Sequence, residues 1–195
     1  MKPPPPYRIT EWVAIGPRPD GSGGPSLGDL AAAGYGHLID LNADPDEGLR
    51  AGREGLSYHP LRTTDETDVG EWLDNLGEVV RIIGLAVDRR EKVYLHCTYG
   101  VGRSPTMAMG YLVASRGWTP SRAMRYVKSR GEGVWGEGNP TERYRRIVEV
   151  CARPLGREQP TKRPARKVDR PPNSRRPRRR RAGEERRSAR PQAAG

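Results

Sequence analysis

Cysteine and long apolar runs are both scarce in this 195-residue sequence. Its cysteines are Cys97 and Cys151, too few for the disulfide framework of a small secreted domain, and they indicate a reducing compartment. No stretch reaches the roughly 18 apolar residues of a membrane span, and the start, MKPPPPYRITEW, has no apolar segment of signal-peptide length. These absences predict a cytoplasmic protein without a membrane-spanning segment.

The sequence also lacks an internal repeat and a cluster of metal-ligating residues. His37 and His59 do not stand among cysteines, histidines and aspartates at the spacing of a metal site. We interpret both as structural or surface residues. We therefore expect no metal and no organic cofactor.

Negative charge is sparse in the last fifth of the chain. Residues 157–195 hold 15 of the 35 Lys+Arg but 4 of the 24 Asp+Glu, and so carry the whole net charge of +11. Large apolar residues are almost absent there, so we expect the Arg/Pro-rich tail 154–195 to be disordered, like the Pro-rich start 1–6. Three interpretations of the tail stay open: it is merely solvating, it binds nucleic acid without base stacking, or it docks on acidic proteins or anionic membranes.

Residues 7–153 alternate strand-like and helix-like segments and have the usual size of one domain. Apolar runs predict the strands, and apolar side chains at helical spacing predict the helices. Asp68, Thr119 and Asn139 stand where N-caps are expected, the last two followed by proline. The predicted strands are 7–16, 37–42, 56–61 and 92–97, and the predicted helices are 26–33, 68–83, 104–115, 119–130 and 139–153. This alternation predicts an α/β fold with a mostly parallel central sheet flanked by helices.

The most informative stretch is VYLHCTYGVGRSPT, residues 93–106, where a predicted strand, a glycine-bearing turn and a predicted helix follow one another. Such a turn gathers backbone amides, and the helix N-terminus adds partial positive charge, which is typical of an anion site. Gly100 and Gly102 permit left-handed backbone and close approach, and Arg103 offers a planar fork of donors for two phosphate oxygens. The expected substrate-binding residues are Thr98, Tyr99, Gly100, Val101, Gly102 and Arg103.

Cys97 stands at the mouth of this predicted phosphate site. The amides, the helix dipole and Arg103 favour a thiolate over a thiol, just as they favour bound phosphate. Cys97 is therefore expected to be a nucleophile, with phosphocysteine as the natural intermediate. The alternative, a buried structural cysteine, does not explain the arginine and glycines at this spacing. Cys151 stands among apolar residues of the last predicted helix and is interpreted as a core residue.

The stretch HCTYGVGRS resembles the H-C-x5-R-S/T signature of the cysteine-dependent protein tyrosine phosphatases, especially the small dual-specificity type. Residues 7–152 are similar in order and size to that family's catalytic domain, and the tail lies outside the resemblance. Rhodanese-type sulfurtransferases usually place four residues between cysteine and arginine, where this chain has five. Cdc25-like phosphatases also have five but lack an upstream acid. The resemblance implies the protein tyrosine phosphatase-like fold and catalysis without a metal.

The resemblance also implies a general acid about thirty residues before the cysteine, because the departing oxygen needs a proton. Asp65 stands 32 residues before Cys97, just ahead of the long predicted helix. Asp68 competes for the role but is better interpreted as the N-cap of that helix. Glu66 is a weaker third candidate, and the sequence leaves the choice between the two aspartates open.

Further residues around the motif receive supporting roles. By resemblance, Ser104 donates a hydrogen bond to the cysteine sulfur and helps it leave, and it also stands where a helix N-cap is expected. The same resemblance implies that His96 orders the loop through its ring nitrogens and supports the thiolate. Asp40 is interpreted as a supporting residue at the edge of the sheet. Arg62 is either a surface residue or a substrate contact.

Together, these residues predict hydrolysis of phosphomonoesters on proteins, both phosphotyrosine and phosphoserine or phosphothreonine, by a monomer. The chain shows no counterpart of the aromatic loop that deepens the pocket of tyrosine-specific relatives. The alternatives are an RNA 5′-phosphatase, a phosphoinositide phosphatase, a silent phosphate-binding module, and a nucleic-acid-binding protein that uses its tail. Relatives that act on phosphoinositides tend to carry basic residues inside the loop. The corresponding residues here, Thr98, Tyr99 and Val101, are not basic, so a phosphoinositide substrate is the less favoured alternative.

Overall fold

The computed structural model describes residues 6–20, 23–131, 134–135 and 142–152, with side chains through residue 150. All of these residues belong to one compact unit, which spans Met1–Glu158. Two segments are expected to be disordered, residues 1–6 and 154–195, and both lie outside the described residues except for Pro6. The predicted cap Asn139 and the side chain of Cys151 also lie outside them.

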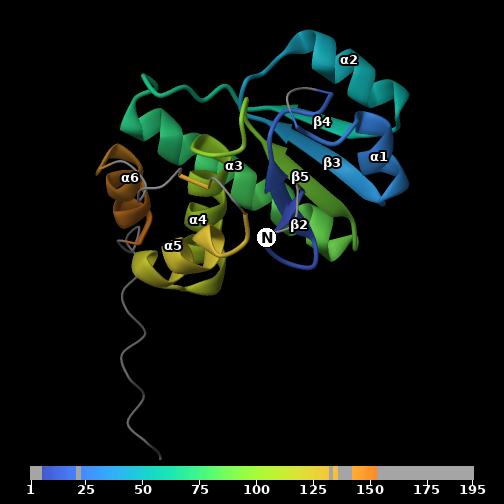
Figure 1. Ribbon diagram of the computed structural model, residues 1–195. Coiled ribbons are helices and arrows are strands. Elements are labelled where there is room, and N and C mark those ends of the chain that lie inside the picture. The colour runs from blue at the N-terminus through green and yellow to red at the C-terminus, as the bar shows by residue number, and fades with distance from the viewer. Residues whose placement is uncertain (1–5, 21–22, 132–133, 136–141, 153–195) are drawn as a thin grey trace, which may run out of the picture. The chain divides into compact units, whose positions relative to one another are not determined.

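Five strands of the described chain form one sheet in the order β1-β2-β5-β3-β4 (Figure 1). The parallel pairs are β2 with β5, β5 with β3, and β3 with β4, whereas β1 pairs with β2 in antiparallel fashion. The strands are β1 (Tyr7–Arg8), β2 (Val13–Gly16), β3 (Tyr35–Asp40), β4 (Ser57–Pro60) and β5 (Lys92–His96). The predicted α/β fold with a mostly parallel sheet is confirmed.

Helices cover both faces of the sheet. Successive side chains of a strand point to opposite faces, so a strand that is apolar throughout needs cover on both sides. In β5, Val93 and Leu95 belong to the larger core cluster, shared with α3 to α6, and Tyr94 belongs to a smaller one, shared with α1 and α2. Figure 1 shows the same division. The helices are α1 (Leu27–Ala32), α2 (Pro45–Arg53), α3 (Val69–Asp88), α4 (Arg103–Arg116), α5 (Pro120–Lys128) and α6 (Glu142–Ala152).

Two of the predicted N-caps are in place. Asp68 caps α3, where its Oδ1 accepts a hydrogen bond from the backbone N–H of Gly70 at 2.6 Å. Thr119 caps α5, with Pro120 at the first helical position. Each cap satisfies a backbone N–H that has no partner inside its helix. The start of α3 is therefore fixed immediately after the segment that carries Asp65.

Helix α2 is not expected from the sequence pattern, although Asp44 and Pro45 form the same cap-and-proline start as in α5. The two buried residues of α2 are Glu47 and Ala51. The largest side chain on the buried face of this helix is a glutamate, so large apolar residues do not recur at helical spacing. A search for apolar periodicity therefore does not reveal the helix. Glu47 also brings α2 into contact with the residue that precedes Cys97.

Candidate active site

The cysteine loop, residues 97–102, joins the end of β5 at His96 to the start of α4 at Arg103. β5 lies between β2 and β3, and Gly16 and Asp40 are the register partners of His96 on the two sides. The loop therefore stands at the carboxyl edge of the parallel strands, where α/β folds bind their ligands.

The two glycines of the cysteine loop serve different purposes. Gly100 has a φ of +70°, and a Cβ there would lie well under 3.0 Å from backbone atoms of Gly16 and Pro17. Gly102 has a φ of −122°, so the expectation of left-handed backbone is wrong at this residue. A Cβ at Gly102 would instead lie 3.2 Å from the hydroxyl of Tyr144. Gly100 thus permits the turn, and Gly102 leaves room for a side chain from α6.

Cys97 is 3% exposed, and its Sγ lies 3.5 Å from Oγ of Ser104. The same hydroxyl lies 3.4 Å from the carbonyl oxygen of Gly16. Because a serine hydroxyl has one proton, Ser104 donates either to Gly16 or to the sulfur. Ser104 is not the N-cap of α4, as its alternative interpretation held: the cap residue is Gly102, without a side-chain hydrogen bond. The hydroxyl is therefore available to Cys97.

The guanidinium of Arg103 is held from two sides. Its Nη1 donates to the carbonyl oxygen of Thr63 at 2.8 Å and lies 3.4 Å from that of Leu41, and its Nη2 donates to Oγ1 of Thr98 at 2.8 Å. Thr98 in turn donates to Oδ1 of Asn42 at 2.9 Å. These bonds fix the plane of the guanidinium before any anion binds, which lowers the entropy lost on binding.

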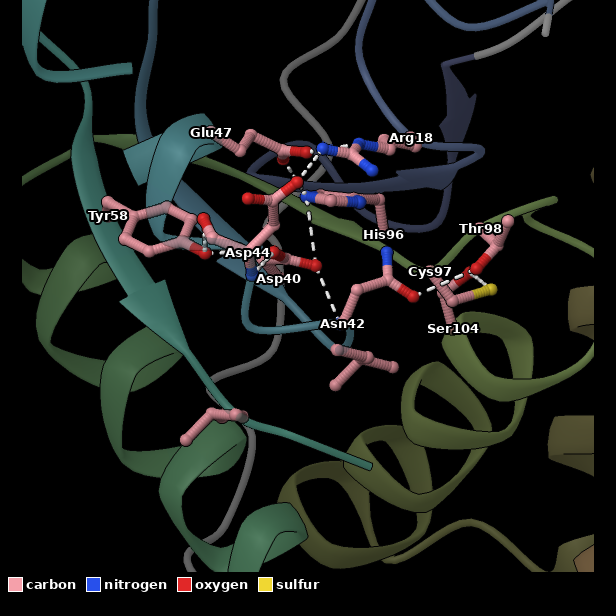
Figure 2. Close-up of polar contacts among 12 residues, drawn as sticks. Arg18, Asp40, Asn42, Asp44, Glu47, Tyr58, His96, Cys97, Thr98 and Ser104 are labelled. Carbon is pink, nitrogen blue, oxygen red and sulfur yellow. Dashed lines mark hydrogen bonds and ion pairs between the residues drawn. The ribbon is translucent and has the colours of Figure 1, made fainter. Parts of the chain in front are cut away.

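Asn42 is a site residue that the motif does not reveal. It lies two residues beyond the end of β3, at the same edge of the sheet as the cysteine loop. Figure 2 shows its side chain pointing toward Thr98, with Cys97 and Ser104 close by. The signal in the sequence is its place at the carboxyl end of a predicted buried strand, where polar residues gather around a ligand.

Behind the loop, His96 lies in a fully buried ionic cluster with Glu47 and Asp40 (Figure 2). Its Nε2 is 2.7 Å from Oε1 of Glu47 and 3.7 Å from Oδ1 of Asp40. The first is an ion-pair distance, although the ring N–H is not aligned for a hydrogen bond. Oε2 of Glu47 accepts from Nε of Arg18 at 2.8 Å, and Arg18 also pairs with Asp44. Charged partners therefore surround the ring that precedes the cysteine.

Asp40 organises the turn after β3. Its carboxylate accepts from the backbone N–H groups of Asn42 at 2.6 Å and Asp44 at 2.9 Å, and from the hydroxyl of Tyr58 at 2.8 Å. Burial, and then the hydrogen bond to Asp40, raise the pKa of Tyr58, so its hydroxyl remains a donor. Asp40 thus has the supporting position expected for it.

Asp40, Glu47 and His96 are also the one group of potential metal ligands among the described residues, with ligand atoms within 4.8 Å of one another. Asp40 accepts three hydrogen bonds and Oε2 of Glu47 accepts from Arg18, whereas Oε1 of Glu47 and both ring nitrogens of His96 have no hydrogen-bond partner within the described chain. A cation bound between Glu47 and His96 would lie beside the Arg18 guanidinium, which shares the same carboxylate. The like charge of Arg18 disfavours a metal ion at this cluster.

The Asp65 loop, residues 61–68, approaches the site from the other side. The hydroxyl of Tyr144, on α6, donates a hydrogen bond to Oδ1 of Asp65. Trp72 Nε1 donates to the carbonyl oxygen of Thr64 at 3.2 Å, and Arg143 donates to that of Thr67. The structure thus places the Tyr144 hydroxyl on Asp65 and beside the space that a Cβ at Gly102 of the cysteine loop would occupy.

The competing carboxylates have other positions. Asp68 is engaged as the cap of α3, the role that the sequence predicts for it. Glu66 is exposed, and its backbone N–H bonds to Oγ1 of Thr64. Arg62 is also exposed, and its carbonyl oxygen accepts from Asn75. Among these residues, Asp65 is the one that Tyr144 links to the cysteine loop.

Two side chains of the cysteine loop face solvent. Tyr99 is 68% exposed and Val101 is 39% exposed, although large apolar side chains are usually buried. The carbonyl oxygen of Val101 accepts from the backbone N–H of Trp135 at 2.6 Å, which ties the loop to a segment beyond α5. Tyr99 and Val101 are therefore placed to form a rim around whatever the loop binds.

A cysteine at the end of a central parallel strand, an oxyanion loop and an arginine at the start of the next helix define the class of cysteine-dependent phosphatases. Residues 33–139 match the family model described as dual specificity phosphatase, catalytic domain. The chain belongs to this family. No helix in the described part of the chain is long and apolar enough to cross a membrane.

The sequence is also similar to those of individual phosphatases. The chain is 30% identical over 125 residues to phosphatidylglycerophosphate phosphatase PTPMT1 of Arabidopsis thaliana, a match that covers 63% of this chain and 36% of the relative. It is 35% identical over 75 residues to human phosphatidylglycerophosphatase and protein-tyrosine phosphatase 1, covering 38% of this chain and 37% of the relative. The chain thus spans little more than a third of the length of either relative.

Solved structures show the same fold. Tk-PTP in its active form has a TM-score of 0.60 at 20% identity, over 76% of this chain and 97% of that one. PTPMT1 has a TM-score of 0.58 at 20% identity, over 74% of this chain and 94% of that one. At these identities the likeness concerns the fold alone.

Proposed function

We propose that this protein hydrolyses phosphomonoesters through a phosphocysteine intermediate. The observation that carries the proposal is the grouping of Cys97, Ser104 and Arg103 at one loop: the sulfur lies 3.5 Å from the serine hydroxyl, and the guanidinium is oriented by Thr63 and Thr98. A nucleophile, a donor for its departure and a clamp for phosphate oxygens are the parts that this reaction needs.

In the first step, the Cys97 thiolate attacks phosphorus. A bond forms between Sγ and phosphorus while the bond from phosphorus to the ester oxygen breaks, and that oxygen takes a proton from Asp65. Backbone N–H groups of residues 98–103 and the Arg103 guanidinium stabilise the three equatorial oxygens. The products are the free alcohol or phenol and phosphocysteine.

In the second step, water attacks the phosphocysteine. The Asp65 carboxylate accepts a proton from the water as its oxygen bonds to phosphorus, and the bond between sulfur and phosphorus breaks. Ser104 donates its hydrogen bond to the departing sulfur, the interaction for which it lies 3.5 Å away. Inorganic phosphate leaves and the thiolate is restored. His96 supports this cycle by ordering the loop from within its buried cluster.

The substrate that we propose is a phosphorylated protein, with both phosphotyrosine and phosphoserine or phosphothreonine accepted. Family membership and the exposed rim residues Tyr99 and Val101 support a site that an extended peptide can approach. A cytoplasmic location, a monomeric state and a nucleic-acid or acidic partner for the tail stay predictions.

A phospholipid phosphate is the second candidate substrate. It is favoured by the names of the Arabidopsis and human relatives, both of which refer to phosphatidylglycerophosphate chemistry, and the human name includes protein-tyrosine phosphatase as well. Residues 97–102 of the cysteine loop include no lysine or arginine, and Arg103 directly follows them, which suits a single phosphate better than a polyphosphorylated headgroup. Parallel assays with phosphotyrosine peptide, phosphoserine peptide and phosphatidylglycerophosphate vesicles rank the candidates.

The chemistry is tested by hydrolysis of p-nitrophenyl phosphate by the wild type, Cys97→Ser and Asp65→Ala. We expect no turnover by the serine variant and a loss of about 100-fold or more for Asp65→Ala, the usual contribution of a general acid. Asp68→Ala is the matched control: it removes the cap of α3, which costs about 1 kcal/mol of stability, but leaves turnover intact. Undiminished turnover by Cys97→Ser contradicts the mechanism, and a large loss for Asp68→Ala alone moves the acid to that residue.

A further inference from the structure

Tyr144 lies where α6 meets both loops of the site. Its side chain is 8% exposed and packs in the main core, with its ring 5.7 Å from that of Trp72. The hydroxyl donates to Oδ1 of Asp65, and a Cβ on Gly102 would lie 3.2 Å from it. One hydroxyl therefore stands between the carboxyl proposed as general acid and the loop that carries the nucleophile.

We propose that Tyr144 is the positioning residue of the general acid: by donating to Oδ1 of Asp65, it directs the transferable proton to Oδ2. This inference rests on the proposed function, in which Asp65 protonates the leaving oxygen. Tyr144 itself exchanges no proton in the reaction.

The argument depends on which atoms of Tyr144 and Asp65 can donate and accept hydrogen bonds. Burial, followed by the hydrogen bond to Asp65, raises the pKa of Tyr144 above its usual value, so the phenol keeps its proton and acts as a donor. Oδ1 is then occupied as an acceptor, and a protonated Asp65 carries its hydrogen on the other oxygen. When that proton moves to the leaving oxygen, the new carboxylate retains the donor that stabilises its charge.

The exposure of Asp65 makes such a contact consequential. Asp65 lies on an exposed stretch of its loop, and a free side chain there would sample several rotamers. Tyr144 belongs to the rigid core, so its hydroxyl restricts the carboxyl to one orientation. Gly102 supports the arrangement, because a larger residue at that position would press on the tyrosine hydroxyl.

A purely structural role for Tyr144 is the alternative, since the neighbouring Arg143 also ties α6 to the Asp65 loop. The two roles differ in their dependence on the leaving group. Loss of acid positioning slows substrates whose leaving oxygen needs a proton, whereas loss of structure slows all substrates alike.

The test compares phenyl phosphate with p-nitrophenyl phosphate, which share a ring and differ in how readily the phenolate departs. For Tyr144→Phe we expect kcat/KM on phenyl phosphate to fall about 10- to 100-fold more than on p-nitrophenyl phosphate, the range for a hydrogen bond to a charged group. Tyr126→Phe is the matched control, because Tyr126 donates to the carbonyl oxygen of Ile9 at 2.8 Å, outside the site, and its substrate ratio should equal that of the wild type.

Asp65→Ala separates the failure of this inference from that of the proposed function. If Asp65→Ala changes the substrate ratio and Tyr144→Phe does not, the positioning role is wrong and the acid stands. If Asp65→Ala leaves the ratio unchanged, both assignments are wrong. In the double variant Asp65→Ala/Tyr144→Phe, we expect no further change in the ratio beyond that of Asp65→Ala; an additive change overturns the inference.

Discussion

The two loops of the candidate site are built in opposite ways. The cysteine loop is anchored from beneath by fully buried residues, His96, Glu47 and Ser104, and its nucleophile and clamp lie within one short stretch of sequence. The Asp65 loop is largely exposed and is held by side chains that come from α3 and α6. The proposed nucleophile, Cys97, is thus part of the core, and the proposed acid, Asp65, is held near it by side chains from two helices that are distant in sequence.

This difference predicts where the protein is most sensitive. A change beneath the cysteine loop should cost stability and activity together, because buried backbone and charges have no means of relaxing. A change at the Asp65 loop should cost activity with little effect on folding. From the largest expected effect to the smallest, the first two of the following variants test the cysteine loop and the third tests the scaffold far from the site; Asp65→Ala, described above, tests the other loop.

Gly100→Ala should have the largest effect. Its φ is +70°, and the added Cβ would collide with the backbone of Gly16 and Pro17, so we expect about 2 to 3 kcal/mol less stability and near-complete loss of p-nitrophenyl phosphate turnover. Gly117→Ala is the matched control, since Gly117 has a φ of +61° with nothing within 4 Å of a Cβ. It should lose about 1 kcal/mol in urea unfolding and keep its activity. Equal losses of stability and activity in the two variants would show that the positive φ alone, and not the collision with Gly16 and Pro17, causes the effect.

Glu47→Gln should have the next largest effect. It removes the buried carboxylate charge that accepts from Nε of Arg18 at 2.8 Å, and because Arg18 is one-third exposed we expect a loss of about 1.5 to 3 kcal/mol, the range for a hydrogen bond between charged groups. Glu78→Gln makes the same chemical change in an exposed pair with Arg81 and should change stability very little, because solvent screens such a pair. Urea unfolding of the two variants measures the contrast. A loss for Glu47→Gln as small as for Glu78→Gln would show that the cluster does not anchor the cysteine loop.

The smallest effect concerns the pH dependence of stability, at the far edge of the sheet. Burial, and then the nearby His37 ring at 3.0 Å, lower the pKa of His59 below its usual 6.5. The unfolded chain therefore binds this proton more readily, and stability should fall as the pH drops from about 6.5 toward the lowered pKa. The measurement is the urea unfolding midpoint as a function of pH. His59→Gln should make this midpoint less dependent on pH below about 6.5 and should leave the pH profile of turnover unchanged. A shifted turnover profile would mean that the scaffold and the site are coupled.

The same contrast explains what the sequence predicts well. The nine residues of HCTYGVGRS are contiguous, so their spacing alone indicates the strand, the anion loop and the helix that the structure contains. Asp68 is predicted as a cap because capping is a local interaction. The parallel sheet follows from the alternation of strands and helices, which is also visible along the chain.

Other features depend on contacts between distant residues and have no local signal. Tyr144 reaches Asp65 across 79 positions of sequence, and the hydrogen bond of Thr98 to Asn42 spans 56. Helix α2 escapes prediction because its buried position holds Glu47, whose partners are Arg18 and His96. Gly102 is assigned to backbone freedom by its residue type, whereas its neighbour Tyr144 explains it. Such features appear only once the chain is folded.

The hydrogen bond from Arg103 to the carbonyl oxygen of Thr63 has a further consequence. It joins the proposed phosphate clamp to the backbone of the segment that carries Asp65, so under the proposed function a shift of one loop is transmitted to the other. Tyr99 and Val101 take no part in this bond and expose their side chains to solvent. We therefore expect substitutions at these two residues to change substrate preference while the chemistry is retained.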